Sequence, residues 1–310
     1  MKITGTFLDE ITHDIPSQNW GYAEWERDFQ AMQQVGIDTV ILIRCGHKRF
    51  MTYPSAVLAK EQGCYTPPVD LVKMYLELAE RYGMSLYFGT YDSGEFWHKG
   101  EYEKEAELSM KVVEEVWRQY GQYPAFKGWY LSLEVSRNAL SIIDIYTTLG
   151  KHCKDLSSNL PVLISPYIEG QKAVYSFSAE ITKHDGVSPE QHEKEWNAIM
   201  QGISGVVDIV AFQDGHVDFH ELPEYLQINK TLAEKYGLHC WTNIESFDRD
   251  MPIKFLPIKW EKMVLKLQAA EQAGLEKAIT FEFSHFMSPH SCYPQAHGLF
   301  NRYREYLKTP

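Results

Sequence analysis

The chain of 310 residues lacks a long hydrophobic run, and without 18 consecutive apolar residues it offers no candidate for a membrane-spanning helix. It also lacks an excess of basic residues. Its net charge is −12 and its pI is about 5.5, whereas nucleic acid or an anionic membrane surface requires a concentrated basic face. We therefore expect neither nucleic acid nor a membrane as a partner.

Cysteine is also scarce. The five residues Cys45, Cys64, Cys153, Cys240 and Cys292 include no Cys-x-x-Cys pair, so they predict neither a zinc site nor a disulfide framework. Cys45 and Cys240 fall within expected strands and should be small buried side chains. No apolar segment of the secretory type precedes the first expected strand. The chain as it stands is expected to be cytoplasmic, or exported if a signal peptide has been removed.

Short apolar runs alternate with amphipathic stretches along the whole chain. The runs are rich in β-branched and aromatic residues, as strands buried on both faces should be. The expected strands are Ile3–Leu8, Thr39–Arg44, Ser85–Thr90, Phe126–Leu133, Pro161–Ser165, Asp208–Phe212, His239–Ile244 and Lys277–Phe283. Between them, apolar residues recur at helical spacing, as Trp25, Phe29 and Met32 do.

Four of the expected helices stop at a glycine, namely Gly36, Gly83, Gly237 and Gly274, just before the next strand. Eight strand–helix units, several of them with a glycine at the end of the helix, predict an α/β fold, a single (β/α)8 TIM barrel over residues 1–310. No linker or composition shift divides the chain. An open doubly wound sheet is the alternative, but no glycine-rich phosphate loop follows the first strand.

Long segments follow six of the strands, whereas the opposite connections are brief. The long segments are residues 9–20, 45–56, 91–102, 166–177, 213–225 and 284–295. In this fold the loops after the strands build the catalytic face. The asymmetry therefore predicts long βα loops around a deep cleft at the C-terminal face.

Polar residues at the strand tips suit a neutral polyhydroxylated ligand, and aromatic rings nearby can stack on the C–H faces of pyranose rings. The expected substrate-binding residues are Asp9, Trp20, Arg44, Tyr91, Trp97, Tyr167, Gln213, Asp214, Trp241, Asn243, Glu282 and His285. Six aromatic residues lie in or beside this mouth, and about half of them are expected to be core: Trp20, Phe96, Trp97, Tyr167, Trp241 and Tyr293.

Two glutamates stand out because of their places in the strand count. Glu134 ends the fourth run and Glu245 the seventh, and these tips face each other across a barrel mouth. Two carboxylates placed in this way can act on one glycosidic bond from opposite sides. Glu282 is a rival nucleophile if its side chain points inward; outward, it would pair with a lysine or arginine. Asp214, in a QDG sequence, is either catalytic or the cap of a turn.

Three motifs carry a family resemblance: GWY-x-x-x-E ending at Glu134, QDG at 213–215 and W-x-N-x-E ending at Glu245. With the opening Gly5-Thr6-Phe7-Leu8, they make the chain similar to an uncharacterised bacterial family of barrel proteins regarded as glycoside-hydrolase-like. The chain also resembles, more distantly, the hydrolase clan whose catalytic glutamates lie on strands four and seven. That clan usually has Asn before the strand-four glutamate, where this chain has Leu133.

The resemblance implies a retaining glycoside hydrolase acting on an oligo- or polysaccharide, with Glu134 as general acid/base and Glu245 as nucleophile. Such a pair should lie roughly 5–6 Å apart, whereas about 6.5–9.5 Å would indicate inversion. The apolar neighbours Leu133 and Val135 should raise the pKa of Glu134. Asn243 or Arg44 should keep Glu245 charged. No metal or cofactor is implied, and the sugar and the oligomeric state stay open.

Two alternatives remain. A sugar isomerase or epimerase would use strand-tip carboxylates and histidines to bind a divalent metal. The residues of suitable type are Glu134, Asp214, His216, Glu245, Glu282 and His285. The second alternative is a barrel that binds carbohydrate without catalysis, because a fold does not guarantee a function.

Overall fold

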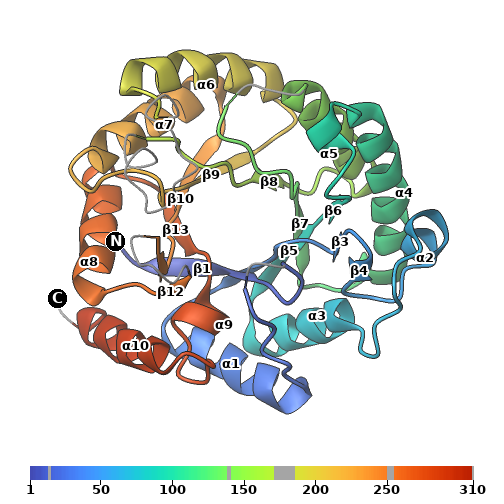
Figure 1. The fold of residues 1–310 in the computed structure, drawn as a ribbon, viewed down its shortest axis with the longest axis horizontal. Coiled ribbons are helices and arrows are strands. Elements are labelled where there is room, and N and C mark those ends of the chain that lie inside the picture. The colour runs from blue at the N-terminus through green and yellow to red at the C-terminus, as the bar shows by residue number, and fades with distance from the viewer. Residues whose placement is uncertain (13–14, 138–140, 171–185, 250–254, 309–310) are drawn as a thin grey trace.

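The computed structural model describes residues 1–12, 15–137, 141–170, 186–249 and 255–308. Eight parallel strands close into a barrel in the order β1-β13-β10-β9-β8-β7-β5-β2 (Figure 1). Their bounds are β1 Ile3–Leu8, β2 Thr39–Leu42, β5 Ser85–Gly89, β7 Phe126–Tyr130, β8 Val162–Ile164, β9 Ile209–Gln213, β10 His239–Asn243 and β13 Lys277–Thr280. The predicted TIM barrel is confirmed.

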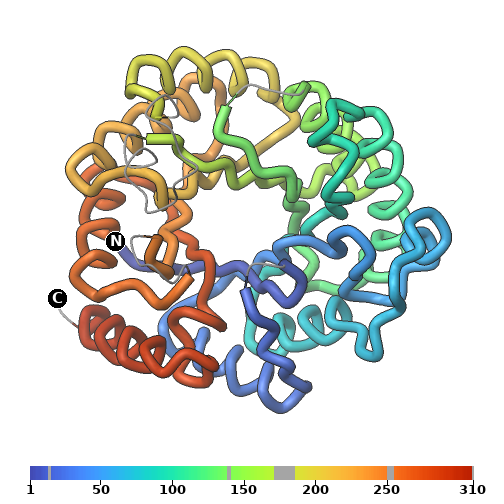
Figure 2. The backbone as a smooth tube through the Cα atoms, in the orientation of Figure 1, coloured from blue at the N-terminus to red at the C-terminus, as the bar shows by residue number. Residues whose placement is uncertain are grey.

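Helices surround the barrel, and the chain runs once around the ring, so that its first and last parts lie side by side (Figure 2). The pairing of β1 with β13 closes the ring. The helices are α1 Tyr22–Gln34, α2 Ala56–Gln62, α3 Leu71–Tyr82, η1 Trp97–Lys99, α4 Tyr102–Tyr120, α5 Ile142–Leu156, α6 Pro189–Ile203, α7 Leu222–Tyr236, α8 Trp260–Gln272, α9 Phe283–Phe286 and α10 Pro294–Tyr306. No described helix has the length and apolar composition needed to cross a bilayer.

The four predicted helix stops adopt the left-handed backbone that favours glycine. The φ angles are 84° at Gly36, 67° at Gly83, 73° at Gly237 and 66° at Gly274. A side chain at such a position would be strained, which explains why glycine ends these helices. The sequence pattern therefore predicted both the elements and their boundaries at the floor of the barrel.

Two apolar layers stabilise the fold. One fills the barrel interior with side chains that include Phe7, Tyr130, Ile209 and Ile279. The larger layer lies between the strands and the surrounding helices. The five cysteines are free, and Cys45 and Cys240 are buried as expected. Cys240 lies in β10, but Cys45 lies beyond the end of β2.

Short strands lie in the loops at the C-terminal face of the barrel. The loops after β2 and β5 contribute β3 Gly46–His47, β4 Phe50–Met51 and β6 Tyr91–Asp92, which form a small sheet. The loop after β10 contributes β11 Phe247–Asp248, paired with β12 Leu256–Pro257. Of the predicted long loops, positions 13–14 and 171–177 lie outside the described residues.

Candidate active site

A cavity of about 130 Å³ lies at the carboxyl ends of the barrel strands. Its lining residues come from the loops or strand ends at β1, β2, β7, β9, β10 and β13: Thr12, Ile43, Arg44, Glu134, Gln213, Phe247, Arg249, Phe255 and Phe281. Since this end of the barrel carries the catalytic face of such folds, the cavity is the candidate active site.

Glu134 supplies the carboxylate of this lining. It lies four residues beyond Tyr130, the last residue of β7, which is the fourth barrel strand. The Tyr130 hydroxyl, buried in the barrel interior, donates a hydrogen bond of 2.9 Å to Glu134 Oε1. Burial raises the pKa of Glu134 above its usual value, although the Arg44 charge and the hydrogen bond from Tyr130 oppose the rise. The side chain thus tends to keep a proton, as a general acid must.

Arg44 places a permanent cation beside Glu134. Its Nη1 lies 3.2 Å from Asp92 Oδ2, and its Nε is buried without a hydrogen-bond partner. Burial alone would raise the pKa of Asp92, but the hydrogen bond from His47 and the Arg44 charge hold that pKa at about 2. The unsatisfied Nε leaves a donor on a cavity-lining residue, and a substrate hydroxyl is the kind of acceptor that would satisfy it.

Glu245 follows β10, the seventh barrel strand, and is about 1% exposed. Arg249 binds it with two parallel hydrogen bonds, from Nε to Oε2 at 2.8 Å and from Nη2 to Oε1 at 2.7 Å. Burial would raise the pKa of Glu245, but the Arg249 charge and its hydrogen bonds hold it at about 2. The expectation that Asn243 or Arg44 would keep Glu245 charged is wrong, because Arg249 does so.

Arg249 also lines the cavity, where Glu245 does not. The guanidinium lies 4.9 Å from the centroid of the Phe247 ring and 6.0 Å from that of Phe255, both of which belong to the same lining. Arg249 therefore stands between Glu245 and the aromatic side of the cavity. For Glu245 to contact a ligand in the cavity, Arg249 has to release at least one of the two Glu245 carboxylate oxygens.

The QDG segment connects the two glutamates. Gln213 hydrogen-bonds to the Glu134 carboxylate and donates from Nε2 to Ser165 O at 2.7 Å. Asp214 Oδ1 accepts from the Glu245 backbone N–H at 3.1 Å. A Cβ on Gly215 would lie 1.8 Å from Glu245 Oε2, so only glycine leaves room for that carboxylate. The segment thus fixes the position of both acids.

Lys266 completes the support of Glu245 from helix α8. Its Nζ donates to Asp214 Oδ1 at 2.7 Å and to the Glu245 carbonyl oxygen at 3.1 Å. Burial raises the pKa of Asp214 in spite of this cation. Asp214 was predicted to be catalytic or a turn cap, and in the structure its carboxylate anchors the backbone of Glu245.

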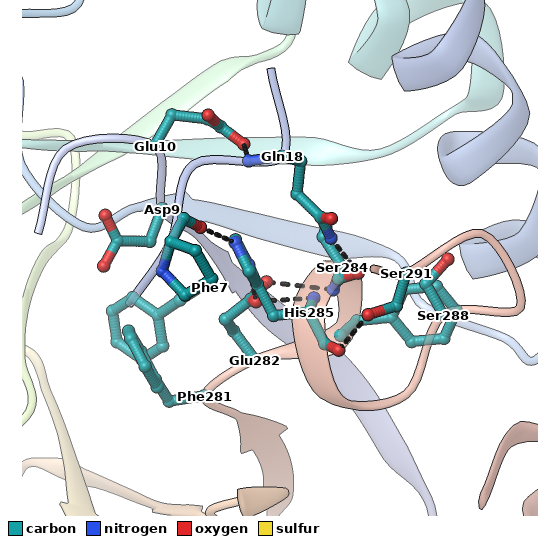
Figure 3. A network of polar contacts seen from close by, with 12 residues as sticks. Phe7, Asp9, Glu10, Gln18, Phe281, Glu282, Ser284, His285, Ser288 and Ser291 are labelled. Atoms are coloured by element: carbon teal, nitrogen blue, oxygen red, sulfur yellow. Dashed lines mark hydrogen bonds and ion pairs between the residues drawn. The ribbon is translucent and has the colours of Figure 1, made fainter. Parts of the chain in front are cut away.

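Glu282 lies away from the cavity, in a network at the start of α9 (Figure 3). It accepts from the backbone N–H groups of Ser284 at 2.9 Å and His285 at 2.7 Å, and it forms an ion pair with the His285 ring. Phe281 lines the cavity instead, and its ring centroid lies 5.9 Å from that of Phe7. Glu282 and Phe281 therefore point to opposite sides, as the alternation predicted.

His285 is the cation of this network. Burial lowers its pKa, but the Glu282 charge and hydrogen bond raise it to about 9. Its Nε2 donates to the Pro16 carbonyl oxygen at 2.7 Å. Glu282 was expected to pair with a lysine or arginine if it pointed outward; its partner is a histidine three residues further on.

The other predicted residues divide between the mouth and the scaffold. Asp9 Oδ1 accepts from the backbone N–H groups of Ile11 and Thr12, both at 2.9 Å, and its buried Oδ2 has no hydrogen-bond partner. Tyr167 pairs with Gln213 in an isolated bridge and so borders the site. Asn243 donates to Ser165 Oγ at 3.3 Å.

Four predicted aromatic residues pack into the scaffold. Trp20 packs on Trp25 with ring centroids 5.1 Å apart. The Tyr91 hydroxyl donates to Lys48 O at 2.6 Å. Trp97 Nε1 donates to Asp92 Oδ1 at 3.4 Å. Trp241 lines a hollow at the floor of the barrel.

These placements put three of the six predicted mouth aromatics, Trp20, Trp97 and Trp241, away from the cavity lining. The rings in the cavity lining are those of Phe247, Phe255 and Phe281.

Sequence reasoning missed Arg249 and Lys266. Arg249 lies four residues after Glu245 in a loop, where spacing alone predicts no contact. Lys266 carried a usable signal, because it sits on the buried face of α8 beside Met263, Leu267 and Ala270. A lysine on an apolar helix face needs a buried anionic partner.

One group of metal-ligand type occurs among the described residues, in the loop after β9. Asp218, His220 and Glu221 place ligand atoms within 4.8 Å of one another. The metal-binding set expected for an isomerase shares no residue with this group. Three of that set's carboxylates, Asp214, Glu245 and Glu282, already bind cationic side chains.

A closed parallel barrel with a carboxylate cavity at its C-terminal face places the molecule among the (β/α)8 barrels. The chain belongs to the family described as Domain of unknown function (DUF4434), which it matches over residues 3–293. This confirms the predicted resemblance to an uncharacterised barrel family. A comparison with curated proteins finds no match.

Solved structures resemble the whole chain. The crystal structure of a protein from Bacteroides thetaiotaomicron, named as a candidate alpha-L-fucosidase, shares 58% identity with a TM-score of 0.95 over 100% of this chain and 96% of that one. An endo-1,4-beta-D-mannanase from Thermotoga petrophila shares 11% identity, with a TM-score of 0.58 over 99% of each chain. A beta-glucuronidase from an uncultured Clostridium shares 15%, with a TM-score of 0.56 over 98% of this chain and 50% of that one. The last two likenesses show the fold.

Proposed function

We propose that this protein is a retaining glycoside hydrolase that acts on an oligo- or polysaccharide, with Glu134 as general acid/base and Glu245 as nucleophile. The observation that carries the proposal is the contrast between the two carboxyl groups. Burial raises the pKa of Glu134, whereas Arg249 holds the pKa of Glu245 at about 2. Environments that push two carboxyl pKa values apart assign one acid and one anion to the same reaction.

The relatives support the same class of reaction. A solved relative at 58% identity is named as a candidate alpha-L-fucosidase, and more distant barrels are named as glycosidases of several kinds. The positions of Glu134 and Glu245, after the fourth and seventh barrel strands, match the resemblance from which the prediction began.

The proposed reaction has two steps. Glu134 gives its proton to the glycosidic oxygen while Glu245 attacks the anomeric carbon, so the leaving group departs as an alcohol and a glycosyl ester forms on Glu245. Glu134, now ionised, takes a proton from water, which attacks the same carbon and returns Glu245 to its carboxylate. This sequence requires a carboxyl separation of about 5–5.5 Å, which stays a prediction.

Arg249 has two tasks in this scheme. It keeps Glu245 ionised, and it must yield an oxygen of Glu245 to the sugar, because both oxygens are bound in the free protein. The rings of Phe247 and Phe255, tilted by 59° to each other, already lie near the guanidinium and can hold it by cation–π contact when it releases an oxygen of Glu245. Arg249 is thus a positioning residue for the nucleophile.

We predict that Arg249→Gln shifts the acidic limb of the kcat/KM profile upward by at least two pH units. A nucleophile acts when deprotonated, so activity falls as the pH drops through its pKa. That pKa is about 2 with Arg249 present, and without the guanidinium burial should lift it above the usual 4.5. The basic limb, set by Glu134, should lie above 4.5 in both proteins because its pKa is raised.

The matched control is Arg137→Gln. Arg137 binds Glu195 through Nε and Nη2 in the same two-pronged manner, but its side chain is 45% exposed. Its loss should leave both limbs in place. An acidic limb unchanged by Arg249→Gln would show that this arginine does not set the protonation of the nucleophile.

The proposal is tested by assaying the purified protein against a panel of oligosaccharides and aryl glycosides. The first-formed product is then examined by proton NMR. We expect at least one glycan to be cleaved, with the anomeric configuration of the substrate kept in the product. A folded protein that cleaves nothing on the panel would contradict the hydrolase assignment. A product of opposite configuration would remove Glu245 from direct attack.

A further inference from the structure

Two aromatic side chains stand in solvent on the catalytic face, outside the cavity. Phe50 is 62% exposed and Tyr65 is 54% exposed, the two highest values among the large exposed hydrophobic residues of the described chain. Their ring centroids are 5.6 Å apart, at an interplanar angle of 52°. Large apolar side chains grouped in solvent mark binding surfaces more often than isolated ones do. We call Arg49, Phe50 and Tyr65 the aromatic platform.

The aromatic platform is built on hydrogen-bonded backbone. Phe50 lies in β4, which forms a three-stranded sheet with β3 and β6 beside the barrel (Figure 1). The Tyr65 N–H donates to Arg49 O at 2.9 Å, and Phe50 and Tyr65 form a parallel bridge. A backbone ordered in this way reduces the freedom that the two segments lose when a ligand binds, which favours their use as a preformed surface.

Arg49 gives the platform polar donors. Its guanidinium lies 4.7 Å from the centroid of the Tyr65 ring, and its Nε and Nη2 donate to Gly63 O at 3.2 and 3.1 Å. The arginine is therefore held over the Tyr65 ring, and its remaining N–H groups can donate to hydroxyl acceptors. An aromatic face flanked by fixed donors is suited to a sugar ring, which has apolar C–H faces and a hydroxyl rim.

The platform belongs to the same end of the barrel as the cavity. His47 of β3 pairs with Asp92 of β6, and Asp92 binds the cavity residue Arg44. Phe50 is only six positions after Arg44, so their Cα atoms lie at most roughly 22 Å apart. A glycan held at the cavity can therefore extend toward the platform.

We propose that the aromatic platform binds a sugar unit of the same glycan at a distance from the cleaved bond. The inference rests on the proposed function for its substrate class, an oligosaccharide longer than the cavity itself holds. A protein partner suits the surface less well. Aromatic side chains bury about 150–250 Å² each, so the two partly exposed rings supply well under the roughly 800 Å² per partner of a stable interface.

The test measures binding without hydrolysis. Fluorescently labelled Glu134→Gln protein is applied to a microarray of oligosaccharides of graded length, and the strongest ligand is then titrated by calorimetry. Adding Phe50→Ala and Tyr65→Ala should weaken binding of the longer oligosaccharides by about tenfold or more, the scale of lost aromatic stacking. Circular dichroism checks that the substituted protein is folded.

The chain offers a matched control in Tyr22→Ala. Tyr22 is 41% exposed, and the Arg81 guanidinium lies 5.8 Å from its ring centroid, so it repeats the chemistry of Tyr65 on helix α1. This variant should bind oligosaccharides like the parent protein. Retained affinity after the Phe50 and Tyr65 changes, or a parent protein that binds no glycan, would overturn the proposal. A fall in oligomer size caused by those changes would assign the platform to self-association instead. Binding gives an answer whether or not hydrolysis is found.

Discussion

Replacing Glu134 with Gln is expected to lower kcat on a natural glycan by about 10²- to 10⁴-fold, the usual contribution of a general acid/base. The introduced amide would retain the size of the side chain and a hydrogen bond with Tyr130 but would have no acidic proton to give. The loss should depend on the leaving group. The dinitrophenolate of a dinitrophenyl glycoside departs without protonation. The rate of the glycosylation step should therefore change little for this substrate and fall steeply for the glycan.

The measurement is a comparison of kcat/KM for the two substrates in the variant and in the unaltered protein. Glu276→Gln is the control, since Glu276 pairs with His239 at the barrel floor and its side chain is 51% exposed. Equal losses on both substrates would point to a binding or folding defect, and no loss on either would assign the acid to another residue. Added azide should capture the glycosyl ester of a Glu134→Ala variant with net retention, because two displacements occur at the same carbon.

The architecture could be predicted from the sequence because its signals are local. Strand β1 has the predicted bounds, and β10 is only one residue shorter than predicted. The largest errors are three residues each, at β7, predicted as Phe126–Leu133 but ending at Tyr130, and at β13, predicted as Lys277–Phe283 but ending at Thr280. Glu282 accepts the first N–H groups of α9 and so begins a helix where alternation suggested more strand. Glutamate is not a usual N-cap, which is why the pattern concealed this helix.

The positions of the two glutamates after their strands could be predicted, but their partners could not. A carboxylate at a strand tip has a position fixed by the fold, so Glu134 and Glu245 were identified by counting strands. The partner of Glu245 comes from a loop, and loop side chains are placed by tertiary contacts that have no period in sequence. Arg249 therefore took the role that was expected of Asn243 or Arg44.

The aromatic residues show the same limit. Trp241 and Asn243 lie two positions apart on β10 and so share one face of the strand, yet Trp241 is closer to the floor and lines the hollow there. The phenylalanines of the cavity follow their strands instead, and hydrophobic residues in loops look like ordinary core in a sequence. Distance along the strand, more than residue type, decides which ring meets a ligand.

Replacing Glu245 with Ala is expected to abolish glycan hydrolysis, with a fall in kcat of about 10⁴-fold or more, because the glycosyl ester can no longer form. The substitution also leaves Arg249 without its anion. Since removing one member of a buried ion pair costs roughly 3–5 kcal/mol, thermal unfolding is measured alongside activity. The Glu245→Gln variant keeps the shape of the side chain and should be inactive with a smaller loss of stability.

Azide distinguishes a lost nucleophile from a damaged site. In Glu245→Ala, a small anion can enter the vacated space beside Arg249 and attack an aryl glycoside with a good leaving group. One displacement inverts the anomeric carbon, so the product should be a glycosyl azide of configuration opposite to the substrate. Glu195→Ala is the control, because it frees Arg137 from a matching two-pronged pair at the surface and should leave hydrolysis unchanged. Full activity in Glu245→Ala would discard the proposed nucleophile and transfer attention to Asp9, whose buried Oδ2 has no partner at the same end of the barrel.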